Sequence, residues 1–397
     1  MENPINQQYW LKNLTIISIV AAAVVIILGA FTRLSDAGLG CPDWPTCYGH
    51  LWIPDSLSEI AIANSAFPDT PVLEGKAWPE QIHRIMASSL GLLCLTMLIL
   101  VLKRFPSSYW FKPVMLLVGL VTLTVFRAFL DDKLDIPLLL GLVLFFGSIF
   151  TVPHFKQSNN VKLSLFIAGW VILQGLFGMW TVTLNLWPQV VTAHLIGGFT
   201  LISLLWWQLL TLSSTTKPGS GTQHNAIALT AIKPRYISLN KLALAGLVVV
   251  IIQIFLGGWT SSNYAALACP DLPLCQGQIW PDPDFSKGFN LLQDIGPNYL
   301  GGTMDNASRI AVHLSHRIGA IIVTLILLIL AGTLFIRSYM ALSLTLLSVL
   351  GIQVVLGISN VAFYLPLSVA VLHNAGAALL LLILVTINYH LNKRASL

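Results

Sequence analysis

A seven-residue motif with a cysteine at each end occurs twice in this chain, each time after a long apolar segment. Residues 41–47 read Cys-Pro-Asp-Trp-Pro-Thr-Cys, and residues 269–275 read Cys-Pro-Asp-Leu-Pro-Leu-Cys. Gly29 and Thr32, upstream of the first motif, recur upstream of the second with the same offset of 228 residues. A shared offset over several identical residues indicates an internal duplication, so we expect two related structural units.

The apolar segments indicate a membrane protein. Hydrophobic residues make up 56% of the 397 residues and charged residues only 9%, too few to cover a water-soluble surface. A helix needs about 20 apolar residues to cross a bilayer. We count ten such segments, at residues 13–32, 82–102, 111–130, 136–152, 162–183, 189–211, 240–262, 310–335, 340–362 and 368–389. The sequence therefore predicts an all-α polytopic membrane protein of about ten helices.

Basic residues predict the orientation of these helices. With the N-terminus inside, 13 of the 21 Lys and Arg residues fall on the cytoplasmic side, as the positive-inside rule requires. We therefore expect both termini in the cytoplasm. The first residues show no transit or cleavage pattern, which favours a bacterial inner membrane. The net charge of +5 follows from this sidedness, so we expect no nucleic-acid binding.

On this topology both cysteine motifs face the oxidising side of the membrane, where disulfides persist. We expect the pairs Cys41–Cys47 and Cys269–Cys275. Closing so short a loop contributes about 2 kcal/mol, so each pair would shape its loop rather than hold the protein together. A labile redox pair is the alternative. Cys94 lies in an apolar segment and is interpreted as a packing residue.

Four of the nine histidines lie near the outer ends of helices predicted to run inwards. They are His83, His194, His316 and His373. The first and third match at an offset of 233, the second and fourth at 179. Gln174 and Gly178 recur as Gln353 and Gly357 at the same offset of 179. The difference of 54 residues, about one helical hairpin, therefore falls between His83 and Gln174. Each unit would therefore have four helices as parallel repeats, with an inserted hairpin at about 106–158 in the first.

The expected domains are an N-terminal bundle (1–211), a cytoplasmic linker (212–239) and a C-terminal bundle (240–397). Two histidines on facing helices of a bundle are a standard way to build a cofactor site. Imidazoles on opposite sides suit axial ligation of haem iron. A lone histidine at a helix end is usually an interfacial residue, but four at repeat-equivalent positions weaken that interpretation. Zinc fits less well, because neither unit brings three or four ligands together.

The units differ one turn before their first histidine. Glu80 precedes His83, whereas His313 holds the matching place before His316. A carboxylate there could accept a proton or stabilise positive charge on a substrate. The alternative is a helix N-terminal acid that favours the dipole and pairs with Arg84. The remaining histidines have no repeat partner: His50, His154, His224 and His390.

Several stretches together resemble the haem A synthase family. They are residues 29–45, Glu80-x-x-His83-Arg84, residues 174–182 and residues 192–195. The resemblance covers nearly the whole chain apart from the inserted hairpin, which departs from the eight-helix pattern of that family. It implies oxidation of the C8 methyl group of haem O to the formyl group of haem A. We interpret the hairpin as a tolerated insertion rather than as a surface that binds a partner protein.

By similarity, His83 and His194 would hold the substrate haem, with Glu80 as the catalytic carboxylate. His316 and His373 would ligate a permanent haem b that passes electrons. The resemblance also implies haem O synthase and cytochrome oxidase assembly factors as partners, besides membrane lipid. Three arginines are candidate contacts for haem propionates, although arginines at helix ends also face lipid headgroups. They are Arg33, Arg84 and Arg317.

Two other classes of protein remain open. A di-haem electron carrier between quinol and a periplasmic acceptor would need the same four histidines but would have no use for Glu80. A transporter would use the parallel repeats to form a central pathway with broken helices and charges near the midplane. The ionisable residues cluster at the outer edge instead, which disfavours the transporter.

Overall fold

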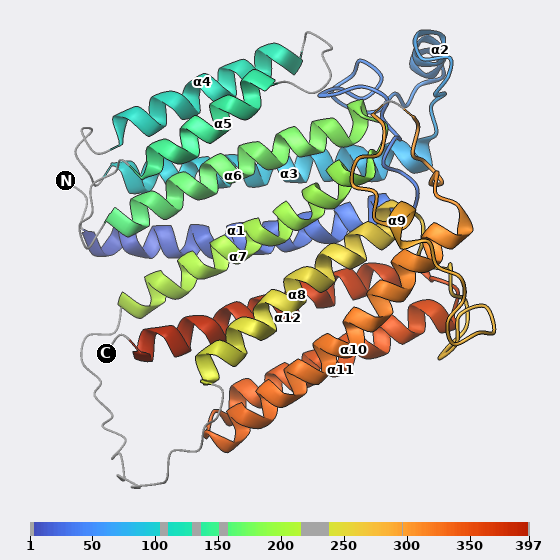
Figure 1. Cartoon of the computed structure of the whole chain (residues 1–397). Coiled ribbons are helices and arrows are strands. Elements are labelled where there is room, and N and C mark those ends of the chain that lie inside the picture. The colour runs from blue at the N-terminus through green and yellow to red at the C-terminus, as the bar shows by residue number, and fades with distance from the viewer. Residues whose placement is uncertain are drawn as a thin grey trace, which may run out of the picture.

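The computed structural model is a bundle of long helices (Figure 1), and it describes residues 4–103, 110–128, 136–150, 158–215, 238–295 and 297–395. Within these ranges no β-strand forms, which confirms the all-α class. Eight of the described helices are long and apolar enough to cross a membrane, so the chain is a multi-pass membrane protein. They are α1 (Pro4–Leu34), α3 (Glu74–Leu102), α6 (Ser158–Thr183), α7 (Pro188–Thr215), α8 (Leu239–Ser262), α10 (Asn306–Ile336), α11 (Met340–Ala362) and α12 (Leu367–Ala395).

The inserted hairpin is present as α4 (Phe111–Ala128) and α5 (Ile136–Ile149). The structure describes 18 residues of α4 and 14 residues of α5. Eight of the ten expected spans are thus found among the described residues, and a membrane crossing by α4 and α5 stays a prediction. The hairpin packs against α6 at the side of the bundle (Figure 1).

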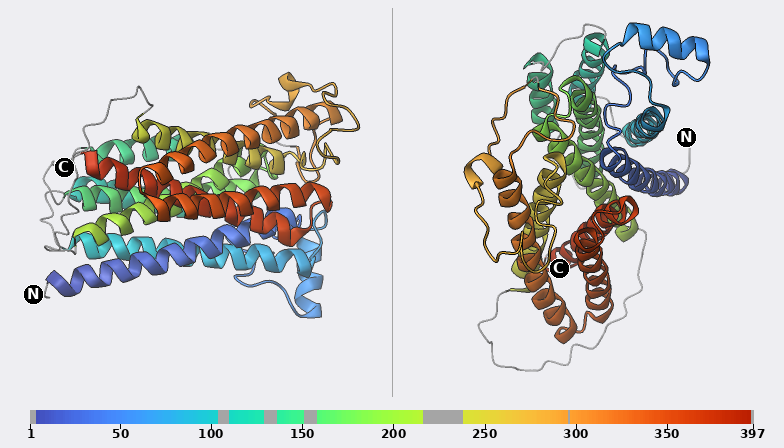
Figure 2. Two further views of the ribbon diagram at one scale, coloured as in Figure 1. Left: turned by 90° about the horizontal axis from the view of Figure 1, so that it is seen from below. Right: turned by 90° about the vertical axis from the view of Figure 1, so that its right-hand side faces the viewer.

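Two rings of four helices make up the bundle. In the first, α1, α3, α6 and α7 each contact their two neighbours, and α8, α10, α11 and α12 repeat this pattern in the second. Each ring has its own cluster of buried apolar side chains. Viewed along the helices, the rings lie side by side (Figure 2). The division into domains at residues 211 and 240 stays a prediction, and residues 216–237 of the expected linker lie outside the described residues.

Residues that match between the units touch each other where the rings meet. Arg33 Nη2 donates to the carbonyl of Ser261 at 2.6 Å, and the Tyr264 hydroxyl donates to Asp36 Oδ1 at 2.9 Å. Both pairs are separated by the repeat offset of 228. A residue meets its own equivalent only on a two-fold axis. The axis of this pseudo-symmetry therefore passes between the C-terminal ends of α1 and α8.

The long loops gather at the end of the bundle opposite both termini (Figure 1). They carry two short helices, α2 (Leu57–Ala66) and α9 (Phe285–Gly288). At the start of α2, Ser56 and Glu59 form a reciprocal capping box, so local hydrogen bonds rather than burial define this helix. Asp305 caps α10 in a similar way, with its side chain accepting from the Ser308 N–H.

Candidate functional site

The first histidine pair lies across the middle of the first ring. His83 on α3 and His194 on α7 project from opposite corners, with ring centroids 6.4 Å apart and ring planes at 89°. Each ring packs on a glycine of a neighbouring helix. A Cβ added to Gly29 of α1 would lie 2.9 Å from His83 Cε1, and one added to Gly178 of α6 would lie 3.5 Å from His194 Cε1. The glycines therefore let the imidazoles approach the neighbouring backbone closely.

The second ring repeats this arrangement. His316 on α10 packs on Gly257 of α8, and His373 on α12 packs on Gly357 of α11, each with Cε1 3.2 Å from the site of a Cβ. The two imidazoles are close enough to interact electrostatically. The sequence comparison used these four glycines as repeat markers and missed that each one is the seat of a histidine. In the sequence, every helix pair carries one such glycine and one such histidine, and this regular pairing could have predicted the contact between them.

The histidine pairs fit a metal carried by a planar macrocycle. Two metal–nitrogen bonds of about 2 Å, plus the distance from each nitrogen to its ring centre, come close to the observed 6.4 Å. Three of the four rings leave Nδ1 buried without a hydrogen-bond partner, those of His83, His194 and His373. Among the described residues no group of three or more His, Cys, Asp or Glu could hold a metal, so other ligands would come from a macrocycle such as haem.

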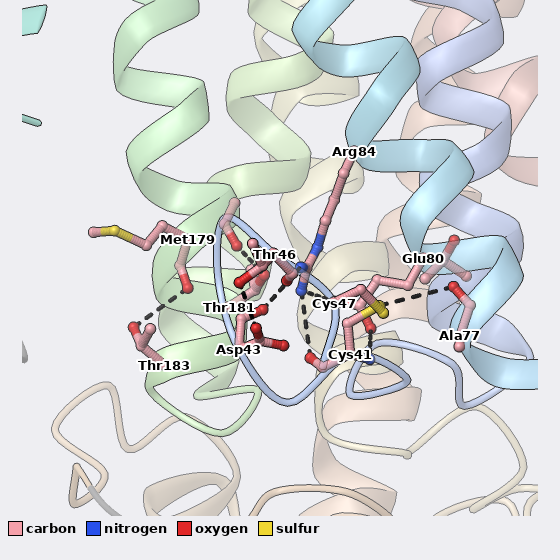
Figure 3. Close-up of polar contacts among 12 residues, drawn as sticks. Cys41, Asp43, Thr46, Cys47, Ala77, Glu80, Arg84, Met179, Thr181 and Thr183 are labelled. Carbon is pink, nitrogen blue, oxygen red and sulfur yellow. Dashed lines mark hydrogen bonds and ion pairs between the residues drawn. A yellow bond between two sulfur atoms is a disulfide. The ribbon is translucent and has the colours of Figure 1, made fainter. Parts of the chain in front are cut away.

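Glu80 anchors the first disulfide loop to α3. Its side chain is only 4% exposed, and its carboxylate accepts hydrogen bonds from the Cys41 N–H at 3.0 Å and from Arg84 (Figure 3). Arg84 also donates to the carbonyls of Asp43 and Thr46, both at 2.8 Å. The predicted pairing of Glu80 with Arg84 is therefore confirmed, and it belongs to a larger network that holds the loop.

His313 takes the same place in the second unit. Its Nδ1 lies 3.1 Å from the Cys269 N–H, and Arg317 Nε lies 3.3 Å from its Nε2. Arg317 also donates to the carbonyls of Cys269, Asp271 and Leu274. A neutral imidazole has one acceptor nitrogen, whereas a carboxylate can accept from both donors. In both loops a cysteine N–H and an arginine face the side chain at this place, and only Glu80 can accept a hydrogen bond from both donors.

Both expected disulfides form, Cys41–Cys47 and Cys269–Cys275. An aspartate folds each loop through its carboxylate. Asp43 accepts from the N–H groups of Tyr48 and Gly49 at 2.6 and 2.8 Å. Asp271 accepts from the equivalent N–H groups at 2.7 and 2.8 Å, and these bonds hold the pKa of Asp271 below its ordinary value. A redox role of either disulfide stays a prediction.

The three arginines proposed for haem propionates have protein partners. Arg84 and Arg317 bind the disulfide loops, and Arg33 lies at the boundary between the units, 4.2 Å from the ring centre of Tyr264. Their contact with propionates stays a prediction. Cys94 is buried and unpaired, as expected. His154 and His224 lie outside the described residues.

Fold and site together define a polytopic membrane protein with a bis-histidine pair in each of two repeated helical units. The chain belongs to the COX15-CtaA family of cytochrome oxidase assembly proteins, whose family model matches residues 12–130 and 137–385. A curated relative from Shewanella oneidensis, named heme A synthase, is 42% identical over 98% of both chains. Another of that name from Caulobacter vibrioides is 25% identical over 91% of both. These matches run through the hairpin, so the expectation that it lies outside the resemblance is wrong.

Proposed function

We propose that this protein is a haem A synthase, a membrane oxidoreductase that converts haem O to haem A for cytochrome oxidase. The proposal rests on a difference between the two units at the residue that contacts the disulfide loop, Glu80 in the first unit and His313 in the second. Each unit holds a histidine pair, but only the first places a carboxylate one turn from its first histidine. Glu80 is also the only buried acidic side chain among the described residues. Family membership and the Shewanella oneidensis relative support the same activity.

In this proposal His83 and His194 hold the substrate haem O, and His316 and His373 hold a resident haem b. When bound, haem iron supplies the oxidation chemistry. The protein residues orient the groups and handle protons. Glu80 is fixed by the Cys41 N–H and by Arg84, so its carboxylate stays in place one turn from His83 to accept a proton or stabilise positive charge.

The test is expression of the full chain with a source of haem O, followed by extraction of the haems. We expect haem A or its hydroxylated intermediate, and their absence would reject the proposal. Glu80→Ala removes both the carboxylate and the loop anchor. Glu80→His is the sharper variant, because His313 shows that an imidazole can occupy this place.

We expect both variants to lose conversion, while Glu80→His keeps the Cys41–Cys47 disulfide and the spectrum of haem b. Conversion by Glu80→His at the unaltered rate would assign Glu80 to the scaffold alone. His316→Ala should remove the low-spin haem b spectrum. An unaltered spectrum would contradict the assignment of the second site.

A di-haem electron carrier is the second candidate. The observation in its favour is that Glu80 and His313 make equivalent contacts with their loops, so a scaffold role accounts for both. The histidine pairs alone would then suffice for electron transfer. Bound haem in both units without any haem A formation would favour this carrier over the synthase.

For location, we propose a bacterial inner membrane with both termini in the cytoplasm. Support comes from the placement of the disulfide loops at the end of the bundle opposite both termini (Figure 1). Labelling of single cysteines introduced at the N-terminus and in the α2 loop tests the orientation. A membrane-impermeant maleimide should reach only the α2 loop from the periplasm. Haem O synthase and cytochrome oxidase assembly factors are the proposed partners.

A further inference from the structure

Three of the four histidines are followed, three residues later, by a glycine that faces a glutamine side chain. The glycines are Gly197 on α7, Gly319 on α10 and Gly376 on α12. A Cβ at any of them would clash with the amide group of a glutamine from the neighbouring helix. The glutamines are Gln174, Gln253 and Gln353, each four residues before the glycine that seats the imidazole. The sequence pattern is therefore Gln-x3-Gly on one helix and His-x2-Gly on the next.

In the second unit both amides bind the backbone of the histidine. Gln253 Nε2 donates to the carbonyl of His316 at 2.9 Å and lies 3.0 Å from the Nδ1 of that ring. Gln353 Nε2 donates to the carbonyl of His373 at 3.0 Å. A carbonyl oxygen has two lone pairs, so it can accept this bond in addition to the bond within its helix. Both histidines of the second unit are thus tied to the preceding helix.

The first unit keeps this arrangement at one histidine only. Gln174 faces Gly197, three residues after His194, as Gln253 and Gln353 face their glycines. At His83 the pattern itself is lost, because Val25 stands four residues before Gly29 and Met86 stands three residues after the histidine. Neither side chain can donate a hydrogen bond.

We propose that Gln253 and Gln353 are positioning residues that hold the axial histidines of a resident haem, and that their loss around His83 lets a substrate haem enter and leave. The inference deepens the proposed function and rests on its assignment of haem O to the first unit. Ligands of a resident group benefit from a fixed position. An exchanging group must detach from at least one histidine, and His83 is the one whose main chain has no amide to hold it.

The test uses the purified full chain with its bound haem b and excess apomyoglobin as the haem acceptor. Gln253→Met keeps the length of the side chain but removes the donor. One hydrogen bond of about 1 kcal/mol corresponds to about fivefold in an equilibrium. We expect haem b to leave this variant about five times faster, with a broadened low-spin spectrum. Gln174→Met is the matched control, because Gln174 lies on α6 in the first unit, away from His316 and His373, and its rate of haem b loss should equal that of the unaltered protein.

The reciprocal double variant, Val25→Gln with Met86→Gly, adds a glutamine amide that can donate a hydrogen bond to the carbonyl of His83. It should slow the loss of haem from the first unit by a similar factor while leaving haem b unaffected. Equal rates for Gln253→Met and the unaltered protein, or an unslowed double variant, would overturn the inference. Haem A formation is measured separately from haem b loss. If the unaltered chain makes no haem A but Gln253→Met still loses haem b faster, the synthase activity is refuted while the positioning role of Gln253 is kept.

Discussion

Glu80 and His313 face the same two donors, a cysteine N–H and an arginine, but they differ in acceptor capacity. The carboxylate accepts both bonds. The imidazole has one acceptor nitrogen, so one of its two close contacts, at 3.1 and 3.3 Å, stays unsatisfied. The second loop is therefore less firmly anchored than the first, even though its sequence is closely matched.

His313→Glu should correct this mismatch, because the carboxylate would accept from the Cys269 N–H and pair with Arg317. We expect reduction of Cys269–Cys275 by dithiothreitol to slow by about tenfold or more, as one added charge-assisted bond contributes about 1.5–3 kcal/mol. Alkylation and mass spectrometry measure the rate, with Cys41–Cys47 of the same chain as the internal control. Faster reduction of the second disulfide would contradict the anchoring role.

Asp271 makes the same loop sensitive to acid. The N–H groups of Gly277 and Gln276 lower its pKa, so the ionised form stabilises the folded loop. That stability is fully present above the ordinary pKa of aspartate and is lost as the pH falls through the lowered value. We expect phosphine reduction of Cys269–Cys275 to accelerate at acidic pH. Asp271→Asn should be fast throughout and lose this pH dependence.

At the residue scale, the sequence predicted contacts between residues that belong to the repeated motif or that lie close together along the chain. The disulfides and the Glu80–Arg84 pair are of this kind. The bond from the Cys41 N–H to Glu80 joins residues 39 positions apart, and no local pattern specifies such a contact. The contacts of Arg33 depend on how the two units pack, so its place at their boundary could not be predicted either.

Among the elements, the hairpin packs closely on α6 of the bundle. Phe145 of α5 is fully buried, and its ring fills the space beside Gly169 of α6. Further aromatic rings, Phe146 and Phe166, surround this contact. The hairpin is thus packed as part of the fold.

Gly169→Ala should loosen this joint, because its Cβ would clash with the Phe145 ring. Overpacking of this kind costs about 1–3 kcal/mol. We expect a lower midpoint of thermal unfolding in detergent with unaltered haem spectra, since the hairpin lies outside the ring of helices that holds the histidines. Gly175→Ala is the control on the same helix, because no atom lies within 4 Å of its added Cβ. Equal midpoints for the two variants would show that the joint does not stabilise the protein.

For the eight long helices, length and composition alone predicted the element. The segments predicted at 111–130 and 136–152 also form helices, α4 and α5. Apolar content alone does not separate a helix that crosses the membrane from one that packs an apolar face against a bundle, so the crossing by α4 and α5 stays a prediction.

For the whole molecule, the boundary between the units fixes the relative position of the two haem sites. Arg33 stacks on the Tyr264 ring, and Asp36 accepts from the hydroxyl of that tyrosine. Tyr264→Ala removes both contacts. We expect a lower thermal midpoint for the chain while each haem keeps its spectrum, because no histidine is touched.

Tyr364→Ala, at a 71% exposed tyrosine in the second unit, is the control and should leave the midpoint unaltered. Loss of the first-unit haem alone in an Arg33→Ala variant would instead support the predicted propionate contact of that arginine.

The contacts on the pseudo-symmetry axis require the two units to carry different residues at matching positions. In a homodimer of single units, position 33 would meet a second arginine and position 36 a second aspartate, and each like-charged pair would repel. Once the two units were encoded in one chain, the two sides of the axis could mutate separately. Serine and tyrosine now stand opposite Arg33 and Asp36. A dimer of identical units could not place unlike residues opposite each other on its axis, so this boundary depends on the two units differing in sequence.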